Sequence, residues 1–82
     1  MKLFQFNQPS APAWDLVQPD DAVLLKRDAV YLLLQPLPPC TIFVLKSDCQ
    51  ARNLAIPAQV QAINFEDWVQ LTLQYQQVIN CH

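Results

Sequence analysis

Glycine is absent from this 82-residue chain, and its absence excludes several common ligand-binding loops. The phosphate-binding loop of nucleotide hydrolases, the dinucleotide-binding turn and the nucleophile elbow of hydrolases each need glycines at fixed positions. Only glycine leaves room for the tight turns and close backbone approaches that these loops make. The sequence therefore contains no motif for nucleotide binding by these loops and none for elbow-type hydrolysis.

Charged residues are also scarce, at 15% of the chain with a net charge of −2, whereas 52% of the residues are hydrophobic. Globular domains average about 25% charged residues. The five basic residues form no run, so we expect no direct contact with nucleic acid. A small domain cannot bury this much apolar surface by itself, so we expect a partner subunit to cover part of it. A homo-oligomer is possible when the chain is isolated.

Long hydrophobic segments are missing as well. The longest unbroken apolar run is Ala29–Leu34, far below the roughly 20 residues that span a bilayer. Met1–Gln8 lacks the apolar core of a signal peptide. We therefore expect no membrane association and a cytoplasmic location.

Cysteine and histidine are too few and too scattered for a metal site or a disulfide framework, so we expect neither a metal nor a cofactor. Of Cys40, Cys49 and Cys81, only Cys49 is a weak candidate for a sulfur-carrying thiol. It lies in the first turn of an expected helix, near Lys46 and Arg52, where a thiolate would be stabilised. The alternative interpretation is a small helix residue without chemistry.

Four short apolar runs indicate the fold, because stretches of about 15 residues separate them, enough for crossover helices between parallel strands. The expected strands are Lys2–Phe6, Ala22–Lys26, Thr41–Leu45 and Val60–Ile63. Alternating strands and helices predict an α/β fold. We expect a small three-layer domain spanning residues 1–82, with a mostly parallel four-stranded sheet and a long C-terminal helix.

Short helices are expected between the strands, over Ala13–Val17, Ala29–Leu34 and Asp48–Asn53. Asp28 and Ser47 are suitable N-caps for the second and third of these helices. Asn53 is the residue best suited to the left-handed position that ends a helix when glycine is missing.

The C-terminal helix is predicted over Phe65–Ile79, with Asn64 as its N-cap. Its apolar side chains cover roughly 220° of the helix circumference, although packing on one sheet needs only a little over 100°. A second surface is therefore expected to pack against this helix.

The wide apolar arc divides into two sets of side chains. One set is expected to face the chain's own sheet: Phe65, Val69 and Leu73. The other set is expected to lie at a subunit contact, where aromatic residues dominate binding: Trp68, Leu71 and Tyr75.

Three clusters in order along the chain carry a family resemblance: Asp21–Tyr31, Val44–Leu54 and Ile63–Thr72. Together they resemble the TusB/DsrH family of sulfur-relay subunits, within the DsrE/DsrF/DsrH-like superfamily. The chain departs from the family pattern at two glycine positions, which Ala29 and Asn53 occupy.

The resemblance implies a heterohexamer with TusC-like and TusD-like subunits that relays persulfide sulfur for 2-thiolation of the tRNA wobble uridine. This chain would be a non-catalytic subunit and not an enzyme by itself. Arg52 would act at an interface, or form an intrahelical ion pair with Asp48. Two alternatives stay open: a DsrH-like subunit of a sulfur-oxidation complex that carries sulfur on Cys49, and a stand-alone homo-oligomeric binding module.

Overall fold

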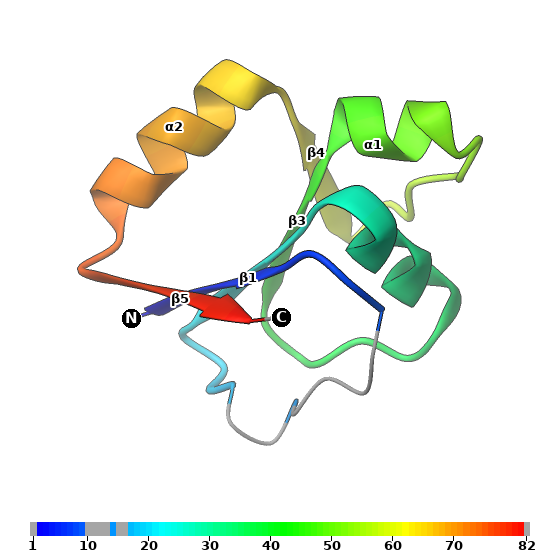
Figure 1. Cartoon of the computed structure of the whole chain (residues 1–82). Coiled ribbons are helices and arrows are strands. Elements are labelled where there is room, and N and C mark those ends of the chain that lie inside the picture. Colours follow the sequence, from blue (N-terminus) through cyan, green and yellow to red (C-terminus); the bar gives the residue numbers. More distant parts are fainter. Residues whose placement is uncertain (1, 10–13, 15–16, 82) are drawn as a thin grey trace.

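The computed structural model describes residues 2–9, 14 and 17–81, and Figure 1 shows their arrangement. Most of the helix expected over Ala13–Val17 lies outside these residues. Trp14 is described, and its ring meets the Phe6 ring edge to face, with 5.2 Å between the centroids. The connection after the first strand therefore packs back onto the sheet through an aromatic pair.

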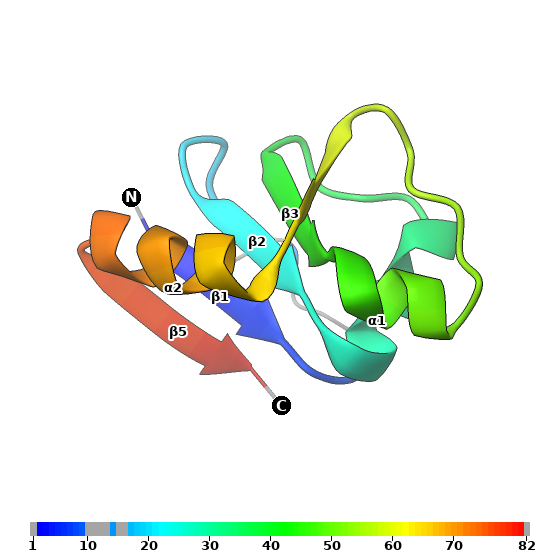
Figure 2. The same ribbon diagram turned by 90° about the horizontal axis from the view of Figure 1, so that it is seen from above.

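A five-stranded sheet forms the centre of the molecule, with the order β4-β3-β2-β1-β5 (Figures 1 and 2). Every neighbouring pair is parallel. The strands are β1 (Lys2–Phe6), β2 (Ala22–Leu25), β3 (Thr41–Leu45), β4 (Val60–Ile63) and β5 (Gln77–Cys81). The α/β class and the parallel sheet expected from the sequence are thereby confirmed.

The expected number of four strands is wrong, because the C-terminal segment forms the fifth strand. Helix α2 (Phe65–Gln74) ends before Tyr75, whose backbone is extended, and does not continue to Ile79. Strand β5 instead pairs with β1, with Ile79 opposite Phe4. Without β5, the almost fully buried strand β1 would be a sheet edge with unpaired peptide groups, so tertiary pairing prevails over helix propensity here.

The helices between the strands are short. The 3₁₀ helix η2 (Arg27–Leu34) follows β2, and helix α1 (Lys46–Ala51) follows β3 directly. Neither has a side-chain N-cap hydrogen bond, so the expected capping by Asp28 and Ser47 is wrong. Helix α1 begins directly after β3 and η2 begins one residue after β2, and Asp28 instead makes an ion pair.

The end of α1 follows the expectation for Asn53, which has a φ of 54°. The Leu54 N–H donates to the Cys49 carbonyl oxygen at 2.9 Å, and the Asn53 N–H donates to that of Gln50 at 3.2 Å. These two bonds are the pattern of a Schellman motif, in which one left-handed residue ends the helix. Asparagine supplies that conformation in a chain without glycine.

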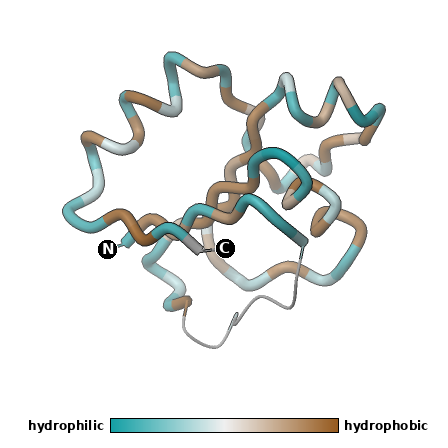
Figure 3. Tube along the Cα trace, in the orientation of Figure 1, coloured by the Kyte–Doolittle hydropathy of each residue, from teal (hydrophilic) through white to brown (hydrophobic). Residues whose placement is uncertain are grey.

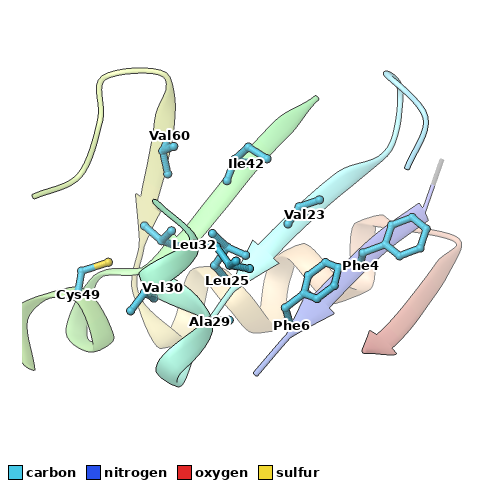
Figure 4. Packing of buried hydrophobic residues seen from close by; sticks show 11 residues of the cluster. Phe4, Phe6, Val23, Leu25, Ala29, Val30, Leu32, Ile42, Cys49 and Val60 are labelled. Atoms are coloured by element: carbon cyan, nitrogen blue, oxygen red, sulfur yellow. The ribbon is translucent and has the colours of Figure 1, made fainter. Parts of the chain in front are cut away.

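Successive side chains of each strand point to opposite faces of the sheet, and helices cover both faces. The face that η2 and α1 cover is called the η2 face, and the face that α2 covers is called the α2 face. Figure 4 shows the η2-face cluster, with α2 behind the sheet. The two clusters are Phe4, Phe6, Val23, Leu25, Ala29, Val30, Leu32, Ile42, Val44, Cys49 and Val60 on the η2 face, and Leu3, Ala22, Leu24, Phe43 and Leu71 on the α2 face.

Candidate functional site

The two sides of α2 are the most unusual feature of the surface. The Asn64 side chain caps the helix by accepting the Asp67 N–H at 2.7 Å, as expected. From this start, Leu71 points into the α2-face cluster and is buried, with Trp68 and Tyr75 packed beside it. The side of α2 that faces the sheet, continued by Tyr75 just beyond its end, therefore consists of the residues that the sequence analysis expected at a subunit contact.

Three large apolar side chains lie on the outer side of α2. Phe65, Val69 and Leu73 are 66%, 46% and 75% exposed, respectively. The expectation that these three side chains face the sheet is therefore wrong. One short helix has to cover a whole sheet face, and the larger Trp68 and Tyr75 side chains fill that space better than Val69 and Leu73 do.

The three exposed residues follow a spacing of four along α2, so they form one continuous row, which we call the outer row. Figure 3 shows hydrophobic segments recurring along this helix as well as in the central strands. The side chains that face the sheet and those of the outer row together form the wide apolar arc expected from the sequence. Among the described residues, only the part of this arc that faces the sheet is covered. An apolar row of this kind typically marks an interaction surface.

Trp68 contacts two further side chains through its indole ring. The Lys26 Nζ lies 4.4 Å from the ring centroid, and the Phe65 ring meets the indole edge to face at 5.1 Å. Burial lowers the pKa of Lys26, and the nearby Arg27 lowers it further. The Trp68 Nε1 is buried and has no hydrogen-bond partner among the described residues. These contacts fix the end of β2 against α2.

Arg52 joins α1 to η2. Its Nε and Nη2 both donate to one Asp28 carboxylate oxygen, at 3.1 and 2.8 Å. Its Nη1 donates to the Asp48 carbonyl oxygen at 3.1 Å and lies 3.8 Å from the Asp48 carboxylate. The hydrogen bond to Asp28 raises the pKa of Arg52. The intrahelical pair is present, and the pair with Asp28 adds a link that sequence spacing did not predict.

A second link in the same cluster involves strained backbone. The Arg27 N–H donates to the Asp48 carboxylate at 2.7 Å, and Arg27 has a φ of 53°. A residue with a Cβ pays about 1–2 kcal/mol for this left-handed conformation. The carboxylate therefore helps to hold a turn that most chains would build with glycine.

Cys49 does not lie where a sulfur carrier should. Its side chain is 0% exposed and packs in the η2-face cluster. Burial raises the pKa of its thiol, and Asp48 raises it further, while Arg52 acts in the opposite direction. A reactive cysteine needs an exposed thiolate, so the structure favours the interpretation of Cys49 as a core residue.

Cys40 lies in the turn before β3, where it lines a cleft of about 640 Å³ at the amino end of the sheet. Burial raises the pKa of this thiol as well, and Asp21 adds to the effect. Cys81 ends β5, and His82 lies outside the described residues. Within the described ranges, no three histidine, cysteine or acidic side chains come together as metal ligands.

The fold that holds these features is a parallel five-stranded α/β sheet, and it matches a solved structure. The crystal structure of the ychN protein from E. coli superimposes with a TM-score of 0.72, covering 98% of this chain and 97% of that one. The two sequences are 16% identical, so the likeness shows a shared fold. A search of curated protein sequences gives no match.

The family follows from the sequence comparison. The model of the family described as "DsrH like protein" matches residues 7–78 of this chain. The chain belongs to this DsrH-like family, and the resemblance noted from its three clusters is confirmed. The coarse function that follows from the family is that of a sulfur-relay related protein. In the described part of the chain, no helix has the length and apolar character needed to cross a membrane.

Sequence reasoning missed three features. The β-branched pair Val78 and Ile79 was a usable signal for β5, since such residues favour strands. The left-handed position at Arg27 had no signal, because arginine is not typical there. The cleft lined by Pro36, Pro38, Pro39 and Pro57 had no local signal either, because its residues come together only in the folded chain.

Proposed function

We propose that this chain is a non-catalytic subunit of a TusBCD-like complex, which relays persulfide sulfur toward 2-thiolation of the tRNA wobble uridine. It would hold TusC-like and TusD-like subunits in a cytoplasmic heterohexamer while a cysteine of a partner carries the sulfur. Membership of the DsrH-like family supports the sulfur-relay setting. The outer row of α2 supports the role in assembly, and it is the observation that carries the proposal.

The state of the two described thiols supports a role without sulfur chemistry. Cys49 is sealed in the core, and the pKa of both Cys40 and Cys49 is raised by burial. A raised pKa keeps a thiol protonated at neutral pH, and a protonated thiol is a poor nucleophile. A persulfide on Cys49 would also need space that the packed η2 face does not leave.

A second candidate is the same structural role in a DsrEFH-like sulfur-oxidation complex, because the family that matches is the DsrH-like one. The burial of Cys49 argues against sulfur carriage by this chain in that complex too. A stand-alone homo-oligomer would use the same outer row, with a second copy in the place of a partner.

The test is made in cells that lack the chain and receive a variant in which Cys40 and Cys81 become serine and Cys49 becomes alanine. Mass spectrometry of tRNA should find 2-thiouridine close to the wild-type level, and the variant should still co-purify with its partners. Loss of 2-thiouridine with the complex intact would overturn the non-catalytic role. Normal thiolation in the deletion strain, together with failed sulfur oxidation, would favour the second candidate.

A further inference from the structure

The cleft at the amino end of the sheet is separate from the outer row of α2 and from the Arg52 cluster. It lies between the turn that precedes β3 and the loop that precedes β4. Its volume of about 640 Å³ falls within the range of ligand sites, roughly 300–1,000 Å³. The proposed function makes no use of this cleft.

The walls of the cleft are rigid. Pro36, Pro38 and Pro39 form one wall, and Pro57 belongs to the opposite one. Each proline ring fixes its backbone φ. Each wall is also closed by a backbone hydrogen bond, from the Cys40 N–H to the Pro38 carbonyl oxygen at 2.9 Å and from the Val60 N–H to that of Pro57 at 3.0 Å. A wall ordered in advance loses little entropy when a ligand binds.

None of the described residues that line the cleft carries a charged side chain. Its polar groups are mainly the amides of Gln35, Gln59 and Gln61, beside the Cys40 thiol and the Thr41 hydroxyl. A charged ligand group would lose its hydration here and find no counter-charge among these lining residues. The nearby Asp21 carboxylate already accepts the Lys2 and Gln18 N–H groups. An amide side chain both donates and accepts hydrogen bonds, as a peptide group does. The chemistry therefore fits an uncharged ligand that is rich in amides.

The cleft continues into a sheet edge. β4 is the outermost strand, it pairs with β3 alone among the described strands, and Gln61 belongs to both the strand and the cleft lining. The strand reads Val-Gln-Ala-Ile and contains none of the charged residues or prolines that usually protect an exposed edge. Its outer peptide groups are therefore available to an added strand.

We propose that the cleft and the free edge of β4 together bind an uncharged, extended peptide segment of another protein. The segment adds to β4 as a sixth strand, through backbone hydrogen bonds. At the amino end of β4 it enters the cleft, where the proline walls select uncharged side chains and the glutamine amides bind its peptide groups.

The test uses ¹⁵N-labelled protein and, as the probe, a capped pentapeptide of alternating threonine and valine. Saturable shift changes are expected in the amide signals of Cys40 and Gln59–Ile63. Gln61→Lys should weaken binding about tenfold, since it places a charge at the edge strand. The matched control Gln76→Lys adds the same charge at an exposed residue outside the cleft and should bind like wild type.

Several results would overturn the proposal. One is the absence of saturable shifts at millimolar peptide, and another is a set of shifts elsewhere on the protein. Equal binding of the same peptide with lysine at its centre would contradict the uncharged selectivity. Shifts along β4 that grow with protein concentration alone would assign the edge to a second copy of the chain. The proposed function is tested separately, by the tRNA analysis of the cysteine variant, and does not depend on binding at β4.

Discussion

The two faces of the sheet differ in the number of helices that cover them and in the number of residues that they bury. On the η2 face, two helices and the Trp14 side chain pack over a cluster of eleven buried residues. On the α2 face, a single helix covers a cluster of only five buried residues, one of which, Leu71, it supplies itself. The same helix also exposes the outer row to solvent. The η2 face thus holds the larger core, although η2 itself exposes Tyr31 and Leu34. The α2 face holds the smaller core, beneath a helix whose outer side is a continuous apolar row.

The largest difference should appear in two neighbouring residues of β2, Leu24 and Leu25, both of which are 0% exposed. Leu25→Ala opens a cavity in the sealed η2 face and should cost about 4 kcal/mol of unfolding free energy. Leu24→Ala, on the α2 face, should cost about 2–3 kcal/mol, because the single helix can settle into the space. Urea denaturation measures the unfolding free energy of both variants. An equal loss in the two would contradict the expected difference between the faces.

Trp68 and Leu73 compare the two sides of α2 itself. Trp68→Ala removes a side chain packed on the sheet together with its contact to Lys26, and should lower stability by about 3 kcal/mol. Leu73→Ala changes an exposed residue and should alter stability by less than about 0.5 kcal/mol. Thermal and urea unfolding measure the change in stability of each variant. If Leu73→Ala is the more damaging change, the two sides have been assigned wrongly.

Acid should loosen the start of β1 through Asp21. Its carboxylate accepts the Lys2 and Gln18 N–H groups, each at 2.9 Å. The Gln18 hydrogen bond is the main cause that lowers the pKa of Asp21. A lowered folded-state pKa gives stability that is complete above the unfolded value of about 3.9 and is lost as the pH falls below it. Asp21→Asn should reduce the dependence of stability on pH in this range. An unchanged dependence would show that Asp21 is not its cause.

The smallest effect should come from the end of α1, where Asn53 supplies the left-handed conformation. Asn53→Ala should cost about 1 kcal/mol, because alanine adopts that conformation poorly. Asn53→Gly should be neutral or stabilising by a few tenths of a kcal/mol. Differential scanning calorimetry can rank the two variants, and the opposite order would show that the Schellman motif does not limit stability.

The strands were predictable because their signals are local. β1, β3 and β4 have the predicted bounds, and β2 ends one residue early. The pairing of β5 with β1 was not predictable from local signals, since residues near the two ends of the chain form it. Whether Val78 and Ile79 join a helix or a strand depends on the unpaired edge of β1, a property of the assembled sheet.

The site was less predictable than the fold. The width of the apolar arc on α2 was readable from periodicity, and it correctly indicated a surplus of apolar surface. Which part of the arc faces the sheet depends on the rotation of the helix about its axis, and the spacing of Phe65, Val69 and Leu73 is the same in either case. The contact of Arg52 with Asp28 likewise needs η2 and α1 to lie side by side.

Sedimentation velocity of the chain co-expressed with its TusC-like and TusD-like partners tests the central claim, that the outer row is an assembly surface. Leu73→Lys should abolish or strongly reduce the large species while the far-ultraviolet circular dichroism of the isolated chain stays the same. Gln70→Lys, an equally charged change at an exposed polar residue of the same helix, should leave the complex intact. An unchanged complex with Leu73→Lys, or equal loss with Gln70→Lys, would contradict the account.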